Sequence, residues 1–267
     1  MEKLLVLGTG NAAVTECFNT CSILETEAGR LLIDCGGGNG ILRQLKAFGL
    51  RPEDIHDLYL SHEHCDHLTG IVWIIRYITQ AMLHGKYDGE LHIWCQALLV
   101  DKILAICGAM LPEKQMRFFG NGIRILPVAD GESARICDRR FTFFDIQSTK
   151  APQYGFEAEL SCGRLIFAGD EPVSDSGRSR AQGADWLLCE AFCLKEDADI
   201  FKPYQKHHST ALDAGRLARE LGVKNLLLWH TEESDLVHRK ARYTAEATRE
   251  FSGKIYVPDD LEIIELC

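Results

Sequence analysis

The 267-residue sequence has no apolar run of about 18 residues, the length that a membrane-spanning helix needs. Its first apolar run is only "LLVL" and glycines follow at once, so the plan of a secretory signal peptide is also missing. Repeats, low-complexity tracts and Pro/Gly/Ser-rich linkers are absent too. We therefore expect a cytoplasmic protein with no membrane partner, and we predict a single domain over residues 1–267.

Positive charge is also in short supply. The chain has 29 Lys and Arg against 39 Asp and Glu, which gives a formal net charge of −10. Proteins that grip nucleic-acid phosphates usually carry a basic surface. The composition therefore argues against a large nucleic acid as partner, although a local basic patch is compatible with it.

Cysteine, in contrast, is plentiful. The eleven cysteines are scattered, and their odd number does not suit a disulfide framework. Without a signal peptide, we expect reduced and mostly buried thiols.

Short runs of apolar and β-branched residues bounded by Gly, Asp or Pro predict strands. They lie at 3–7, 21–26, 30–34, 57–60, 91–95, 123–128, 141–147, 164–168, 185–189 and 225–229. Helical periodicity predicts helices at 40–50, 70–83, 97–109, 209–222 and 235–251. Strands dominate the first third and helices alternate with strands later, which favours stacked sheets flanked by helices.

Metal-binding side chains are concentrated between the predicted strand 57–60 and the following helix. Residues 61–70 read "SHEHCDHLTG", with three histidines and an aspartate within six positions. In an extended backbone His62 and His64 project to the same side, and Asp66 and His67 point elsewhere. The spacing thus offers two ligand pairs to two neighbouring sites, and these ligands suit zinc as well as iron or manganese.

The metallo-β-lactamase superfamily has a signature that resembles "SHEHCDH". Its ribonuclease Z branch has further segments that are similar, in the same order, to "LLVLGTGNAAVTECFNTCSILE", "LLIDCGGG", "LIFAGD" and "NLLLWH". The resemblance implies an α/β fold, the four-layer αβ/βα sandwich with two mixed β-sheets flanked by helices. It places the metals at one edge between the sheets.

The resemblance also implies a ligand set for one or two Zn²⁺ ions, with Mn²⁺ or Fe²⁺ as other options. Taken alone, Asp170 could be a turn residue after a strand, and His230 could be a histidine of the core. The implied ligands are His62 and His64 for the first metal, Asp66, His67 and His230 for the second, and Asp170 as the bridge.

Two such cations would lower the pKa of a shared water molecule. They would also bind the oxygens of an ester or phosphodiester as negative charge builds on them. Asp66 would orient or deprotonate that water. His208 matches the histidine that the ribonuclease Z branch uses near the scissile phosphate, so it is our candidate general acid. The alternative is that His208 is only a surface residue before a helix.

One expected ligand is missing. The family supplies a further histidine to the first metal, and counting back from Gly155 puts it at Thr149, with Lys150 beside it. No histidine occurs between His92 and His207, so a shift of alignment cannot restore it. Either the first site is weaker, with Thr149 or Lys150 as a partial replacement, or a single metal works at the second site.

The substrate is expected to be small. The branch that matures transfer RNA inserts an RNA-holding arm before the bridging aspartate, and here "GFEAELSCGRLIFAGD" passes through a single hairpin. Glu171 adds negative charge beside Asp170. We therefore predict a small ester or phosphodiester. Arg239 or Arg242 is a weaker candidate for binding its anion, the alternative being a solvated helix face.

The preferred function is a metal-dependent hydrolase of an ester-type bond, with phosphodiesters leading. One alternative is a ribonuclease Z-type endoribonuclease acting on tRNA 3′ ends. A second is a non-catalytic sensor that binds metal or nucleotide, although a sensor would not need a general acid. Redox chemistry fits less well, because the extra carboxylate of such sites is missing. The resemblance also suggests a homodimer.

Overall fold

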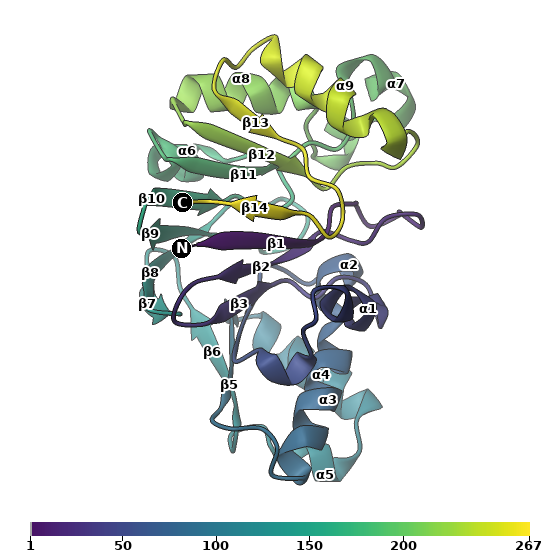
Figure 1. Cartoon of the computed structure of the whole chain (residues 1–267), viewed down its shortest axis with the longest axis vertical. Coiled ribbons are helices and arrows are strands. Elements are labelled where there is room, and N and C mark those ends of the chain that lie inside the picture. The colour runs from purple at the N-terminus through teal and green to yellow at the C-terminus, as the bar shows by residue number, and fades with distance from the viewer. Residues whose placement is uncertain (1) are drawn as a thin grey trace.

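Two β-sheets packed face to face form the centre of the computed structural model, which describes residues 2–267 (Figure 1). Within these residues the first sheet has the strand order β14-β1-β2-β3-β4-β5-β6. Its strands are β1 (Lys3–Gly8), β2 (Cys21–Glu25), β3 (Arg30–Ile33), β4 (Asp57–Leu60), β5 (Leu91–Gln96), β6 (Ile123–Val128) and β14 (Ile263–Glu265). Strands β3 to β6 run parallel, and β1 pairs antiparallel with β2 and β14.

The second sheet has the order β13-β12-β11-β10-β9-β8-β7. Its strands are β7 (Ser133–Ile136), β8 (Arg139–Asp145), β9 (Tyr154–Leu160), β10 (Gly163–Phe167), β11 (Trp186–Glu190), β12 (Asn225–Trp229) and β13 (Lys254–Tyr256). Strands β10 to β13 are parallel, whereas β7, β8, β9 and β10 pair antiparallel. Both sheets are therefore mixed, as predicted.

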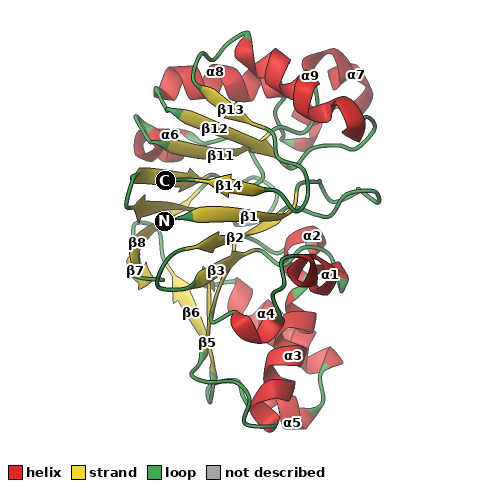
Figure 2. Ribbon diagram, viewed as in Figure 1, coloured by secondary structure: helices red, strands yellow, loops and turns green. Residues whose placement is uncertain are grey.

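Helices cover the outer faces of the two sheets (Figure 2). Those of the first half are α1 (Gly40–Ala47), α2 (Cys65–Leu68), α3 (Ile71–Leu83), α4 (Leu99–Met110) and α5 (Glu113–Met116). Those of the second half are α6 (Asp175–Ala181), α7 (Ala198–Phe201), α8 (Ala211–Leu221) and α9 (Leu236–Thr248). Short 3₁₀ turns lie at Pro52–Asp54, Lys195–Asp197 and Pro203–Lys206.

Three apolar layers hold the sandwich together. One lies between the first sheet and α1, α3 and α4, and another between the second sheet and α6, α8 and α9. The third fills the space between the sheets and is rich in aromatic rings. There the Tyr59 ring meets Phe156 edge-on at 5.1 Å, and the Tyr59 hydroxyl donates to the Tyr154 carbonyl at 2.6 Å. This bond is one link between β4 and the start of β9, two segments that border the site.

The predicted four-layer sandwich is confirmed, and the predicted strands and helices agree with the structure to within a few residues. The runs named from sequence omit β9, which only the hairpin through "GFEAELSCGRLIFAGD" implies. They also omit β7, β13 and β14. Strand β7 is largely exposed, and β13 and β14 have three residues each, so hydrophobic patterning is weak in all of them. Helix α8 is capped by Thr210, whose hydroxyl accepts from Asp213 N.

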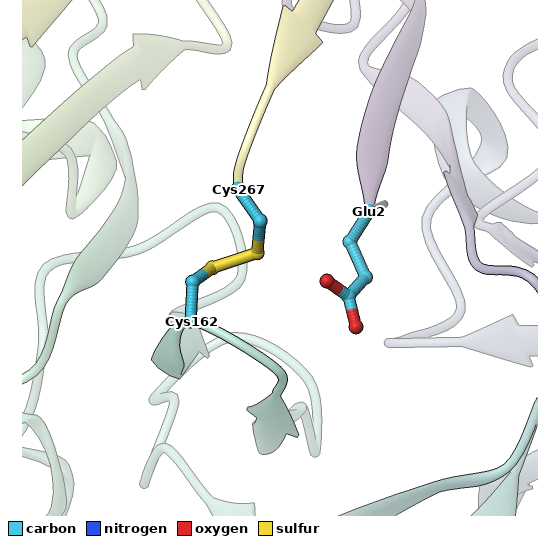
Figure 3. Close-up of side chains that lie close together, drawn as sticks. All are labelled: Glu2, Cys162 and Cys267. Carbon is cyan, nitrogen blue, oxygen red and sulfur yellow. A yellow bond between two sulfur atoms is a disulfide. The ribbon is translucent and has the colours of Figure 1, made fainter.

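The expectation of reduced thiols throughout is wrong for one pair. Cys162, in the turn between β9 and β10, is joined to Cys267 by a disulfide (Figure 3). Nine other cysteines among the described residues are free. Strand β10 leads away from Cys162 toward the metal-binding residues, so the disulfide lies at the opposite end of that strand.

None of the helices over residues 2–267 is long and apolar enough to cross a lipid bilayer.

Candidate metal centre

Five strand ends converge on one edge of the sandwich. The loops after β3 and β4 supply Asp34 and the histidine cluster, and the loop after β10 supplies Asp170. Glu190 is the last residue of β11, and His230 follows β12 directly. Because these strands are parallel within each sheet, their carboxyl ends meet at the same edge. The site thus combines residues from both sheets.

The histidine cluster belongs to the short connection between β4 and α3. His64 is the N-cap residue of α2, in an extended conformation, and Asp66 and His67 lie in the first turn of that helix. The change from extended chain to helix turns the second pair away from His62 and His64, as the spacing predicts. Gly70 is needed at the end of this stretch, because a Cβ there would lie 2.0 Å from the Cys35 carbonyl oxygen.

One group of ligand atoms surrounds Asp170 Oδ2 on the side of Asp66. His67 Nε2 lies 3.6 Å from Asp170 Oδ2 and 3.3 Å from Asp66 Oδ2. His230 Nε2 lies 3.6 Å from Asp170 Oδ2 and 3.5 Å from Asp66 Oδ2. All four side chains are buried. These are the four residues that the resemblance implies for the second metal.

A second group of ligand atoms shares the same carboxylate oxygen, and His67 also lies close to it, within 4.8 Å of His62 and Asp170. His62 Nε2 is 3.4 Å from Asp170 Oδ2 and 2.9 Å from His64 Nδ1. His62 is buried, and His64 is half-buried at the cavity wall. The three residues are those implied for the first metal, and Asp170 Oδ2 is the atom shared by both groups.

Asp34 fixes two of the imidazole rings from behind. Its Oδ2 accepts hydrogen bonds from His67 Nδ1 at 2.8 Å and from Ser61 Oγ at 2.7 Å. Ser61 Oγ also lies 2.9 Å from His62 Nδ1. The His67 ring therefore carries a proton on Nδ1 and directs Nε2 to the metal groups, and Ser61 orients the His62 ring. Asp34 itself has φ of 57°, an uncommon value for a residue other than glycine.

Gln153 holds the bridging carboxylate from the other side. Its Nε2 donates to Asp170 Oδ1 at 2.6 Å and lies 3.1 Å from His62 Nδ1. The contact requires glycine at 169, because that residue has φ of 79° and a Cβ there would lie 2.7 Å from Gln153 Nε2. Oδ1 is thereby occupied, and Oδ2 is left for metal binding.

Opposite charges hold the ligand carboxylates in their ionised forms. Burial by itself would raise the pKa of Asp170, but the imidazoles of His62, His67 and His230 hold it well below its usual value. Burial would likewise lower the pKa of His67, but the carboxylates of Asp66 and Asp34 outweigh it and raise that pKa. Against burial, His67 and His230 likewise hold the pKa of Asp66 below its usual value. At neutral pH Asp66 and Asp170 are therefore carboxylates, the form that binds a cation.

The residues present fit a divalent cation. His67 Nε2 and both ring nitrogens of His230 are buried and lack a hydrogen-bond partner. Buried polar atoms of this kind are normally satisfied, so a ligand that accepts their lone pairs is expected. Two nitrogens and two carboxylate oxygens form a donor set suited to zinc.

A cavity of about 370 Å³ opens onto these ligands. His208 lies in its wall, 8% exposed, with Nδ1 at 3.7 Å from Glu190 Oε2. On its other side, Nε2 lies 3.3 Å from Lys150 Nζ, which can only donate. The Phe192 ring stacks on His208 with centroids 4.8 Å apart. His208 is thus held between a carboxylate and an ammonium beside the metal ligands.

Three candidates from the sequence lie elsewhere or at the margin. Thr149 is exposed, and its hydroxyl is 3.2 Å from His207 Nδ1 rather than near the ligands. Arg239 is buried, with bonds to Thr9, Thr231, Pro258 and Asp259. Arg242 pairs with Asp235, Glu196 and Asp197. Neither arginine is among the residues that line the cavity. The contacts of the two arginines hold α9 against its neighbours instead.

Sequence reasoning gave no role to Asp34, Gln153 or Glu190. Asp34 and Glu190 carried a usable signal, because each is an acidic residue at the carboxyl end of a buried strand. Burying a carboxylate is unfavourable without partners, which marks such positions as functional candidates. Gln153 lies in a loop, and nothing in its local sequence indicated a contact with Asp170.

Comparison with known proteins agrees with this geometry. Residues 2–182 match the model of the family described as "Anti-Pycsar protein Apyc1". The chain belongs to this family. Ribonuclease Z of Mycobacterium bovis (strain BCG / Pasteur 1173P2) is 25% identical over 295 residues, covering 100% of this chain and 99% of that protein. Ribonuclease Z of Halorubrum lacusprofundi is 27% identical over 322 residues, covering 99% and 97%.

Solved structures establish the fold of this Apyc1 family member. The metallo-β-lactamase fold protein YhfI from Bacillus subtilis superposes with a TM-score of 0.79 at 20% identity, covering 98% of each chain. The short form of human tRNase Z gives 0.73 at 20% identity, covering 99% of each. The predicted assignment to the metallo-β-lactamase superfamily and its ribonuclease Z-like branch is confirmed, and with it the class of metal-dependent hydrolase.

Proposed function

We propose that this protein is a metal-dependent phosphodiesterase acting on small molecules. The observation that carries the proposal is the composition of the cavity of about 370 Å³. Metal ligands form its floor, and Lys150, Lys206 and His208 lie in its wall. A site of this size suits a small ligand, and its cationic groups suit a phosphate in a protein whose net charge is −10.

The surroundings of the cavity favour a small diester over RNA. Strands β9 and β10 are joined by a two-residue turn, so the arm expected of a transfer-RNA nuclease is not inserted there. A second cavity of about 290 Å³ shares Phe192 and Lys206 with the first and has Val14 and Phe201 in its wall. It offers room for an apolar or flat substituent of the diester.

Zn²⁺ is the cation we propose, since imidazole and carboxylate ligands suit it, and Mn²⁺ and Fe²⁺ suit the same set. When bound, such an ion acts as a Lewis acid on a phosphate oxygen and lowers the pKa of water. Asp66 Oδ2 would orient the attacking water. His208 Nε2 would give its proton to the leaving oxygen, while Glu190 Oε2 stabilises the positive ring from the Nδ1 side.

Hydrolysis of bis(p-nitrophenyl) phosphate, a thioester and a precursor transfer RNA, assayed side by side, tests the proposal. We expect turnover of the diester, abolished by Asp66→Ala and unaffected by Asp199→Ala, which changes an exposed aspartate. Cleavage of the RNA alone would instead support the ribonuclease Z-type alternative, which the names of the curated relatives favour. No turnover of any substrate by metal-loaded protein would contradict both. We also expect a homodimer, which light scattering would test.

A further inference from the structure

We propose that this protein binds one divalent cation tightly, at Asp66, His67, Asp170 and His230, and that Lys150 supplies the second positive charge of the site. The second part of this inference rests on the proposed function, since it assigns Lys150 to the substrate phosphate. The first part concerns metal binding alone.

The Asp66 group offers four buried ligand residues, and each of its two nitrogens lies near both carboxylates. Zn–N and Zn–O bonds of about 2.0–2.1 Å put neighbouring tetrahedral ligands roughly 3.3–3.4 Å apart. The four observed separations between the His67 and His230 nitrogens and the two carboxylate oxygens are 3.3, 3.5, 3.6 and 3.6 Å. Each nitrogen is therefore close enough to both carboxylates for the four side chains to share one cation.

The His62 group offers fewer ligand atoms. It has two nitrogens of its own, and its third atom, Asp170 Oδ2, is shared with the complete group. His62 Nε2 and His64 Nδ1 are 2.9 Å apart, a hydrogen-bond distance and shorter than the tetrahedral separation. Gln153 donates to Asp170 Oδ1, and this hydrogen bond competes with the use of Oδ1 as an extra ligand. The threonine that replaces the third imidazole is bonded to His207 instead.

Lys150 follows that threonine directly and does enter the cavity wall. Its ammonium is 3.3 Å from His208 Nε2 and 3.9 Å from Glu171 Oε1. The turn that carries it is fixed by Ser148, whose hydroxyl donates to Glu171 Oε1 at 2.7 Å and accepts from Lys150 N at 3.2 Å. The side chain is thus presented to the cavity by a built turn.

An ammonium at this place can do part of what a second cation does. A phosphate oxygen between the cation and Lys150 would replace His208 Nε2 as the acceptor for Nζ. Charge-assisted bonds of this kind hold phosphate strongly. His208 is then free to carry the proton for the leaving oxygen.

Metal binding is tested first, without any assay of turnover. Zinc titration with calorimetry, and metal analysis after dialysis, should give one tight ion per chain. His230→Ala should abolish this tight binding, whereas His64→Ala, the same change in the other group, should leave it. Two ions of similar affinity in the unaltered protein, or loss of the tight ion in His64→Ala, would overturn the proposal.

Inorganic phosphate serves as the probe for Lys150, again without turnover. We expect Lys150→Met to weaken phosphate binding to the zinc-loaded protein by about ten- to a hundredfold, with zinc content unchanged. Lys150→Arg should restore part of the affinity. Lys114→Met, an exposed lysine outside the cavity, is the matched control. Equal phosphate affinity in Lys150→Met and Lys114→Met would refute the role of Lys150, even if the enzyme failed to cleave any diester.

Discussion

Asp34 and His67 are joined by a hydrogen bond of 2.8 Å, from the ring Nδ1 to the carboxylate Oδ2. The bond settles which nitrogen of His67 carries the proton, and so leaves Nε2 for a cation. Through Ser61 the same carboxylate orients His62. One residue at the end of β3 thus prepares ligands of both metal groups before any ion is bound.

Replacing Asp34 with Asn should weaken zinc binding about ten- to a hundredfold, because second-layer partners of metal-bound histidines contribute on that scale. The amide has nearly the same shape but no charge to favour the Nδ1–H tautomer. Competition with a chelator of known affinity would measure the change. Asp199→Asn, at an exposed position, should leave the affinity unaltered. Equal zinc affinities in both variants would show that the ring orientation does not depend on Asp34.

His208 and Glu190 form the second pair on which the chemistry depends. His208→Ala should lower kcat by about 10²- to 10⁴-fold with zinc content unchanged, since it removes the proton donor. The loss should be smaller for nitrophenyl diesters than for alkyl diesters, because an alkoxide needs the proton more. Glu190→Gln should also lower kcat, and again the loss should be smaller for nitrophenyl diesters than for alkyl diesters. Steady-state kinetics on the two diesters would measure these effects.

The control for this pair is His238→Ala, a histidine on the exposed side of α9. It should behave like the unaltered protein on every diester. An equal loss with both leaving groups in His208→Ala would argue that the ring binds substrate rather than donating a proton.

The local parts of this molecule could be predicted from sequence, and the distant contacts could not. The cluster from His62 to His67 lies within one loop, so its spacing alone indicates two ligand pairs. Asp170 and His230 are brought in by parallel strands of the second sheet, and only the order of motifs along the chain pointed to them. Gln153 contacts Asp170 because the start of β9 lies beside the end of β10, a fact of packing with no local signature.

The same reason explains the errors at the edges of the sheets. Strand β14 joins β1 across more than 250 residues, and its three residues show no clear alternation. The disulfide depends on that pairing, because it closes a loop with a sequence separation of 105. The spacing of the cysteines along the sequence could not reveal this pairing. Tertiary contact, and not composition, decides which two of the eleven cysteines meet.

The carboxyl of Asp213 should make the free energy of unfolding depend on pH. Burial would raise the pKa of this carboxyl, but hydrogen bonds from Thr210 and Tyr204 outweigh it and lower the pKa below its usual value. A depressed pKa means that the stabilisation is present above the unfolded-state pKa of about 3.9 and is lost as the pH falls through the folded-state value. Asp213→Asn should therefore lower the free energy of unfolding at pH 7 by about 0.5–1 kcal/mol.

Urea unfolding at a series of pH values would measure this, with Asp199→Asn as the control. The difference between Asp213→Asn and the unaltered protein should shrink as the pH falls from about 4 through the folded-state pKa, below which both carry a neutral side chain. A difference that stays constant over that range would assign the effect to packing rather than charge.

The disulfide should contribute to stability without affecting the metal centre. Cys162→Ser should lower the free energy of unfolding by about 2–4 kcal/mol, because the bond restricts the unfolded chain over a long loop. Reductant should lower the stability of the unaltered protein by a similar amount and leave Cys162→Ser unchanged. Cys65→Ser, at an exposed free thiol, is the control and should still respond to reductant. Zinc content should be equal in all three proteins, because strand β10 separates Cys162 from Asp170. Urea curves that do not respond to reductant, or alkylation of eleven thiols in untreated protein, would contradict the assigned pairing.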